Sequence, residues 1–288
     1  MLGPVVLGPV SRVQLTSGAL HVESHGDPRG PLILCVHGLS ANCRSFDRYV
    51  SDLVGSGRHV VTMDLRGRGH SEVTSPGSYG WDNHVRDLIE LADLFDAHSF
   101  EVIGHSMGGF IGMVLAAAHP ARCTRLVSLD ALGIPEASAL IPIARSVSRL
   151  GQTFPSTDAA REYIRSGGVI AWDSFWDKYF DWEFEPVDDG VRIRTSLAAV
   201  TEDSVYATTQ DIYQLWTRIE CPVLVVRATR PMGPEGGLVV TAADAERFAA
   251  PEAGRLVVDV DADHYTVLTE PAAIDAVTRF AGAAPPNG

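Results

Sequence analysis

A pentapeptide in the first half of the chain, Gly104-His105-Ser106-Met107-Gly108, joins the apolar run 100–103 to the helix-like run 109–119. A Gly-x-Ser-x-Gly turn between a strand and a helix holds its serine out at the carboxyl end of the strand, and the small residues two positions to either side prevent steric collision. The pentapeptide by itself is a weak pattern, so the flanking runs carry the inference. Together they predict a strand, a sharp turn and a helix, with Ser106 as a candidate nucleophile.

Short β-branched runs alternate with helical periodicity from residue 32 to residue 129. This alternation is typical of a parallel sheet covered by helices on both faces. Four of the runs lead into loops at 37–39, 64–71, 104–108 and 130. Because ligands bind at the carboxyl ends of strands in open parallel sheets, we expect these loops to share one rim. The predicted fold class is α/β, with a mostly parallel, doubly wound sheet.

The alternation stops near residue 132 and resumes at the apolar run 222–226. We therefore predict an α/β core at 1–131 and 218–282, a helical cap at 132–217 and a flexible tail at 283–288. Most of the large aromatic residues lie in the cap segment, which indicates an apolar cleft between cap and sheet, although each could equally belong to the cap's own core. The candidate substrate-binding residues are Gly38, Trp172, Trp176, Tyr179, Trp182 and Trp216.

Charge and cysteine content narrow the functional class. The 288 residues carry 23 Lys and Arg against 36 Asp and Glu, a formal net charge of -13, which disfavours binding to nucleic acid or to an anionic membrane surface. The four cysteines form no CxxC pair, as in proteins of a reducing cytoplasm. Residues 1–10 are apolar but interrupted by glycine and proline, which fits neither a signal peptide nor a spanning helix. We expect a cytoplasmic protein; its oligomeric state stays open, with a homodimer as one option.

Four motifs in order resemble those of the α/β-hydrolase superfamily over nearly the whole chain. They are the His37-Gly38 turn, the Asp64-x-Arg-Gly-x-Gly-x-Ser loop at 64–71, the pentapeptide around Ser106, and a histidine after the last strand, His264. A serine hydroxyl needs an imidazole to accept its proton, and that imidazole needs a carboxylate to fix its tautomer. The resemblance implies that His264 is the base, since it follows the last strand.

The acid of such a triad is less clear from the sequence. Family members usually carry an Asp a few residues beyond the strand at 223–226, but residues 227–232 here contain no acid. In zearalenone lactone hydrolases, which this chain resembles at this point, the acid follows the strand after the elbow helix, where Asp130 stands. Asp130 is our first choice, and Glu235 is the alternative. Asp130 could also serve only to cap its loop, as it does in members that use the other site.

The negative charge that develops on a carbonyl oxygen requires fixed hydrogen-bond donors. The resemblance assigns these donors to the backbone N–H groups of Leu39 and Met107. The glycine-rich loop at 66–70 has neither a phosphate-binding lysine motif nor a complete dinucleotide fingerprint, so we interpret it as structural, with Asp64 paired to Arg66. No metal-ligand spacing is present, and we expect no cofactor and no metal.

The sequence therefore predicts a cofactor-independent serine hydrolase that cleaves a small apolar ester or lactone through an acyl-enzyme on Ser106. One alternative is a carbon–carbon bond hydrolase, whose substrate carboxylate would need basic residues such as Arg145, Arg149, Arg161 or Arg165. A cofactor-free haloperoxidase-like activity is another. A ligand receptor that keeps the pocket without turnover is an alternative of a different class.

Overall fold

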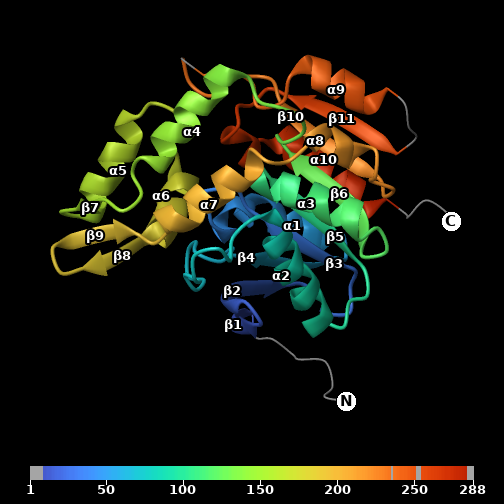
Figure 1. The fold of residues 1–288 in the computed structure, drawn as a ribbon, viewed down its shortest axis with the longest axis horizontal. Helices are drawn as coiled ribbons and strands as arrows, with labels where there is room; N and C mark the ends of the chain where they lie inside the picture. The colour runs from blue at the N-terminus through green and yellow to red at the C-terminus, as the bar shows by residue number, and fades with distance from the viewer. Residues whose placement is uncertain (1–8, 235, 251–253, 284–288) are drawn as a thin grey trace.

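The computed structural model describes residues 9–234, 236–250 and 254–283. An eight-stranded sheet with the order β1-β2-β4-β3-β5-β6-β10-β11 forms its centre (Figure 1). The strands are β1 (Val10–Leu15), β2 (Gly18–His25), β3 (Leu32–Val36), β4 (His59–Met63), β5 (Phe100–His105), β6 (Cys123–Leu129), β10 (Val223–Ala228) and β11 (Arg255–Val260). The six strands from β4 to β11 across the sheet are parallel, whereas β1 and β2 are antiparallel. This arrangement confirms the predicted fold class.

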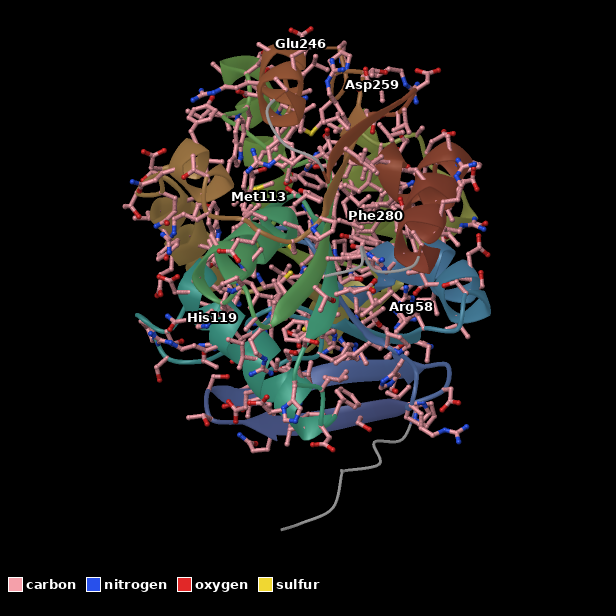
Figure 2. The ribbon with its side chains drawn as sticks, turned by 90° about the vertical axis from the view of Figure 1, so that its right-hand side faces the viewer. Arg58, Met113, His119, Glu246, Asp259 and Phe280 are labelled. Atoms are coloured by element: carbon pink, nitrogen blue, oxygen red, sulfur yellow. The ribbon has the colours of Figure 1, made fainter. Side chains whose placement is uncertain are left out.

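Helices cover both faces of the sheet because the parallel strands bury side chains on both. On β10, Val223 and Val225 point into one apolar cluster and Leu224 and Val226 into another. The first cluster lies under α2 (Trp81–Leu94), α3 (Met107–Ala118), α8 (Ile212–Trp216) and α9 (Ala242–Ala249); the second lies under α1 (Asp47–Gly55) and α10 (Pro271–Gly282). Figure 2 shows Met113 of α3 and Phe280 of α10 on opposite sides of the strands.

The segment between β6 and β10 adds no strand to the large sheet. It contains α4 (Leu140–Val147), α5 (Thr157–Ser166), α6 (Ser174–Glu183), α7 (Leu197–Ala207) and α8, and also a small antiparallel sheet of β7 (Thr153–Phe154), β9 (Gly190–Ile193) and β8 (Phe184–Val187). Most of it lies to one side of the large sheet (Figure 1). The expectation of a purely helical cap missed the small sheet. The sequence signal for this sheet was the short turn of its hairpin. Asp188 and Asp189 form a two-residue turn, and Val187 pairs with Gly190 across it.

The glycine-rich loop after β4 is structural, but its ion pairs differ from the expected one. Arg66 pairs with Asp87 of α2, at 2.5 Å between Nη2 and Oδ1, and not with Asp64. The carboxylate of Asp64 instead accepts a hydrogen bond from the backbone N–H of His70 at 2.9 Å. Gly69 has φ 49°, and a Cβ there would lie 2.2 Å from Asp64 Oδ2. The loop therefore folds back tightly on Asp64, whose carboxylate accepts hydrogen bonds from the N–H groups of His70, Cys43 and Trp182 in place of a guanidinium.

All four cysteines are free thiols, and Cys35, Cys43 and Cys123 are buried. No helix in the described ranges is both long and apolar enough to cross a membrane. Of the predicted tail, only residue 283 lies within the described residues.

Candidate active site

Ser106 stands at the turn between β5 and α3, with φ 54° and ψ -121°. The turn is so sharp that its glycines leave no room for side chains. A Cβ on Gly104 would lie 2.2 Å from the carbonyl oxygen of Gly108, and one on Gly108 would lie 1.9 Å from the carbonyl oxygen of Val36. The small residues on either side of Ser106 are thus required by backbone contact, as the sequence predicts.

A hydrogen-bonded chain connects Ser106 to two side chains from distant loops. His264, in the loop after β11, places Nε2 3.0 Å from Ser106 Oγ, and its Nδ1 lies 2.8 Å from Asp130 Oδ2. An ionised carboxylate can only accept, so Nδ1 carries the proton and Nε2 is free to accept the serine proton. The other oxygen of Asp130 accepts from the backbone N–H of Ala228 at 3.1 Å. The structure therefore brings the three predicted triad residues together.

Asp130 reaches this position because it directly follows β6, which lies beside β10. His264 and Asp130 are both buried, at 5% and 1% exposure, so little solvent screens their contact. Asp261 and Asp263, the other acids near His264, have different partners. Asp261 pairs with Arg230, and Asp263 Oδ1 accepts from the backbone N–H groups of Tyr265 and Thr266. Glu235 lies outside the described residues.

The turn after β3 lies against Ser106, where an oxyanion would form. A Cβ on Gly38 would lie 3.2 Å from the Cβ of Ser106. Met107 is the first residue of α3, so its N–H has no partner within the helix, and it borders the same cavity as Leu39. Leu39 and Met107, whose backbone N–H groups the resemblance assigns as donors, thus line the same cavity as Ser106.

His37 holds the turn in place. Its Nδ1 donates to the carbonyl of Gly38 at 2.8 Å, and its Nε2 accepts from the backbone N–H of Leu65 at 2.9 Å. Burial lowers the pKa of His37 to about 4, so the ring is neutral near pH 7. The carbonyl of Gly38 and the N–H of Leu39 belong to one peptide group. His37 therefore fixes the orientation of a candidate oxyanion donor.

His105, the second residue of the pentapeptide, is a contact that sequence reasoning missed. Its Nε2 donates to the backbone carbonyl of His264 at 2.8 Å, and the two rings lie 4.7 Å apart between centroids. Burial lowers the pKa of His105 well below its usual value. A buried neutral imidazole thus ties the serine turn to the loop of His264. The sequence did contain a signal for this contact, because His105 lies directly before Ser106 in the pentapeptide.

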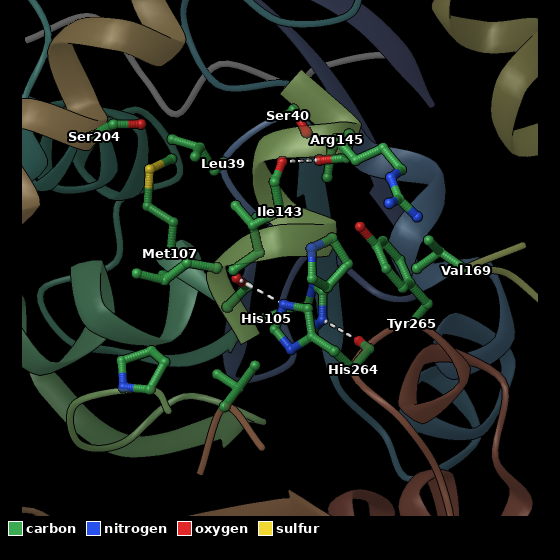
Figure 3. Close-up of a pocket in the computed structure, with 18 of the residues that line it drawn as sticks. Leu39, Ser40, His105, Met107, Ile143, Arg145, Val169, Ser204, His264 and Tyr265 are labelled. Atoms are coloured by element: carbon green, nitrogen blue, oxygen red, sulfur yellow. Dashed lines mark hydrogen bonds between the residues drawn. The ribbon is translucent and has the colours of Figure 1, made fainter. Parts of the chain in front are cut away.

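A cavity of about 860 Å³ opens over Ser106. Its volume falls in the usual range for small-molecule sites, and its wall is predominantly apolar. Figure 3 shows His264 and His105 in the middle, with Leu39 and Met107 to one side and Arg145 and Val169 to the other. The lining includes, from the core, Gly38, Leu39, Trp81, Met107, Phe110 and Leu268, and from the segment between β6 and β10, Ile134, Leu140, Ile143, Ile164, Ile170, Trp176, Tyr179, Phe180 and Ala207.

The family model of the alpha/beta hydrolase fold matches residues 31–271. The chain belongs to the α/β-hydrolase family. Among solved structures of this family, E-2-(acetamidomethylene)succinate hydrolase superimposes with a TM-score of 0.81 at 26% identity, covering 95% of this chain and 99% of that chain. An α/β hydrolase from Novosphingobium aromaticivorans has a TM-score of 0.79 at 28% identity, covering 96% and 99%.

Curated relatives from the α/β-hydrolase family match at similar identity. A 3-hydroxybutyrate-oligomer hydrolase of Cupriavidus necator is 27% identical over 88% of this chain and 90% of its own length. A 2-(acetamidomethylene)succinate hydrolase of Mesorhizobium japonicum is 28% identical over 93% and 94%. The match to the RutD protein of Variovorax paradoxus is shorter: at 26% identity it spans 54% of this chain and 57% of that protein. The relatives are hydrolases with different substrates. Similarity to them therefore supports hydrolase activity but does not identify the substrate.

The aromatic residues predicted to contact substrate divide into two groups. Trp176 and Tyr179 of α6 line the cavity. Trp172, Trp182 and Trp216 are not among its described lining residues and pack elsewhere. The ring of Trp172 stacks on Phe180, Trp182 donates its indole N–H to Asp64, and Trp216 donates its indole N–H to the carbonyl of Leu132. These three therefore hold the cap and its junction with the core.

The aromatic wall also contains two residues from the core that sequence reasoning missed. Trp81 of α2 and Phe110 of α3 stack with centroids 5.2 Å apart and planes 3° apart, and both line the cavity. Each looked like an ordinary buried residue of a helix in the sequence. Only the placement of α2 beside α3 at the serine end of the sheet turns this pair toward the ligand space.

The four arginines considered for a substrate carboxylate have different surroundings. Arg149 lines the cavity but pairs with buried Glu183 at 3.2 Å. Arg161 pairs with Asp158 and Asp181, and Arg165 with Asp177. Arg145 also lines the cavity. Arg149, Arg161 and Arg165 therefore already face carboxylates of this chain.

One group of possible metal ligands occurs in the described part of the chain, at His21, Glu23 and Cys43. The guanidinium of Arg44 contacts the carboxylate of Glu23, and burial raises the pKa of Cys43 well above its usual value. Both features disfavour a bound cation, because a metal would compete with Arg44 and would need the thiolate. None of the three residues belongs to the hydrogen-bonded chain at Ser106.

Proposed function

We propose that this protein is a serine hydrolase that cleaves a carboxylic ester or lactone through an acyl-enzyme on Ser106. The observation that carries the proposal is the continuous chain from Ser106 Oγ through His264 to Asp130, open to an apolar cavity. An activated serine beside a base, with the base oriented by a third group, is the arrangement that nucleophilic acyl transfer requires.

In the proposed first half-reaction each group has a distinct role. Ser106 Oγ attacks the carbonyl carbon of the substrate while His264 Nε2 takes its proton. Asp130 keeps the Nδ1–H tautomer and stabilises the imidazolium that forms. The carbonyl oxygen becomes negative and is received by the N–H groups of Leu39 and Met107. His264 then returns the proton to the departing alkoxide, which leaves as an alcohol.

The second half-reaction uses the same groups in reverse. Water replaces the alcohol, and His264 Nε2 takes a proton from it as the water oxygen attacks the acyl carbon. The tetrahedral intermediate again places its negative oxygen at Leu39 and Met107. Collapse releases the carboxylic acid and returns the proton to Ser106 Oγ. For a lactone, the alcohol and the acid are two ends of one product, which leaves only after this step.

The cavity supports a substrate with a bulky apolar part. Its wall combines the stacked pair Trp81 and Phe110 from the core with Trp176 and Tyr179 from α6. Large apolar walls bind apolar groups by removing their surface from water, while a few polar groups fix orientation. We therefore expect esters of larger hydrophobic acids or alcohols to be better substrates than acetates.

The test is turnover of a series of p-nitrophenyl esters by the wild type and by Ser106→Ala. We expect sustained turnover by the wild type, and a loss of at least about a hundredfold in the variant, since removal of the nucleophile costs orders of magnitude. A single stoichiometric burst from the wild type would favour the ligand receptor. A variant that kept more than about a tenth of the wild-type rate would overturn the assignment of Ser106.

A further inference from the structure

A fully buried ion pair joins α7 to the loop after β4, outside the chain that contains Ser106. Arg68 Nη2 lies 2.6 Å from Asp203 Oδ2, and both side chains have 0% exposure. Burying two charges costs several kcal/mol per ion before their attraction is counted, and apolar residues of similar volume would often be as stable. The pair therefore calls for an explanation other than stability.

The carboxylate of Asp203 is saturated with donors. Its Oδ1 accepts from the backbone N–H of Gly80 at 2.7 Å, and His84 Nε2 lies 3.1 Å from Oδ2. Burial alone raises the pKa of Asp203, but the hydrogen bond from His84 and the charge of Arg68 outweigh it and lower the pKa to about 2. Asp203 is thus ionised and rigidly held, so it can fix the guanidinium of Arg68 in one orientation.

The rest of that guanidinium points to the candidate oxyanion turn. Arg68 Nε donates to the carbonyl oxygen of Leu39 at 3.0 Å, and Nη1 donates to the carbonyl of Arg66 at 3.0 Å. The peptide group after Leu39 is therefore held by Arg68, and the peptide group before Leu39 is held by His37. With both flanking peptide planes fixed, the direction of the Leu39 N–H is fixed as well.

We propose that Arg68 and Asp203 are positioning residues for the oxyanion hole, through which α7 holds the Leu39 N–H in its working orientation. This inference rests on the proposed function, because it assumes that the Leu39 N–H receives the oxyanion. Leu39 and Asp203 both line the cavity, and Figure 3 shows Ser204, the next residue of α7, on the same side as Leu39 and Met107. The donor is thus complete only when α7 is seated on the core.

Arg68→Lys is the main test variant. The ammonium keeps a charge that can reach Asp203, but it lacks the second arm that donates to the carbonyl of Leu39. We expect kcat to fall about 10- to 100-fold, because donors act only at their exact distance and small misplacements cost this much. KM should stay within about threefold, since the ground-state carbonyl uses the donor weakly.

Two further variants separate positioning from folding. The double variant Arg68→Met with Asp203→Leu removes both charges, leaves no buried ion unpaired, and should show the same loss of kcat. Glu202→Gln is the matched control: Glu202 neighbours Asp203 on α7 and accepts from the backbone N–H of Gly77 at 2.9 Å, but it is only half-buried and this contact is open to solvent. This control should keep wild-type kcat. All variants are compared at a temperature where circular dichroism shows them folded.

The decisive readout is inhibition by a trifluoromethyl ketone with an apolar substituent. Ser106 Oγ adds to its carbonyl carbon, the hydroxyl proton passes to His264, and the new oxyanion lies where the Leu39 N–H points. The inhibition constant should rise in Arg68→Lys and in the double variant by the factor by which kcat/KM falls. An unchanged kcat in either folded variant, or a loss confined to KM, would overturn the inference. A wild type without any esterase activity would instead remove the proposed function.

Discussion

Ser106 and Asp130 both have a positive φ, which is rare for residues other than glycine. Among the described residues, only three other than glycine have positive φ: Asp96, Ser106 at 54° and Asp130 at 48°. Such conformations cost on the order of 1 to 3 kcal/mol and persist where the surroundings impose them. Here the two residues follow β5 and β6 directly, so each side chain leaves its strand end toward His264. Two of the three residues in the proposed catalytic chain thus have strained backbone.

The contact between Asp130 and His264 leads to a direct test. Asp130→Asn should lower kcat about a thousandfold or more near pH 7, because the amide neither stabilises the imidazolium nor selects the Nδ1–H tautomer. Asp261→Asn is the matched control, since Asp261 is three residues from His264 but pairs with Arg230. Glu235→Gln should likewise be mild. Steady-state rates of variants with equal melting temperatures would show this, and a severe Glu235→Gln defect beside an active Asp130→Asn would reverse the assignment of the acid.

His37 makes stability depend on pH. Burial lowers the pKa of His37 from 6.5 to about 4. Between pH 4 and 6.5 the unfolded chain therefore binds a proton at His37, whereas the folded chain does not. The free energy of unfolding should therefore fall as pH drops from about 6.5 toward 4, by up to about 1.4 kcal/mol per pH unit from this residue. His37→Asn should remove that part of the slope. Urea unfolding at several pH values would measure it; equal slopes for both proteins would exclude His37 as the cause.

At the scale of the elements, the serine turn is set by close backbone contact between β3, β5 and α3. Gly108→Ala should lower the free energy of unfolding by more than about 2 kcal/mol and abolish esterase activity, because the new methyl group would meet the carbonyl of Val36. Gly55→Ala at the end of α1 is the control, since a Cβ there has nothing within 4 Å. It should be neutral or slightly stabilising. Similar effects of both substitutions in thermal unfolding would show that the turn has more room than described.

Some of the elements and their contacts could be predicted from the sequence, and others could not. The parallel strands were predictable because each is a short β-branched run followed by a polar loop. The family resemblance made Asp130 the first choice over Glu235 for the acid, and Asp130 lies beside His264. The hairpin of β8 and β9 was missed in spite of its two-residue turn, because both strands are short and lie in a segment that was expected to be helical. The partner of Arg66 was not predictable either, since Asp87 lies 21 residues away on α2 and only the packing of that helix brings it near.

For the whole molecule, the cavity is a joint product of core and cap, and this explains why composition located only part of it. The density of aromatic residues predicted that the cap lines the cavity. A residue of the cavity wall, however, must face the sheet as well as be large. Trp176 and Tyr179 of α6 meet this condition, whereas Trp182 lies outside the cavity wall and bonds to Asp64. Trp81 and Phe110 line the cavity from the core side, on α2 and α3.

Specificity should depend on this division. Trp176→Phe should lower kcat/KM for a bulky apolar ester about 3- to 10-fold relative to an acetate ester, because it removes contact area from the wall. Trp216→Phe is the control, since Trp216 is not among the lining residues and its indole N–H donates to the carbonyl of Leu132. It should leave the ratio between the two esters unchanged. A parallel loss on both esters in Trp176→Phe would indicate that Trp176 only supports the cap.

The most direct measurement is the mass of the protein during turnover of a p-nitrophenyl ester, quenched in acid within the first turnovers. We expect one added acyl group per chain, located on Ser106 by peptide mapping and missing in Ser106→Ala. Turnover without an adduct, or an acyl group attached to another residue while Ser106 stays free, would contradict this prediction.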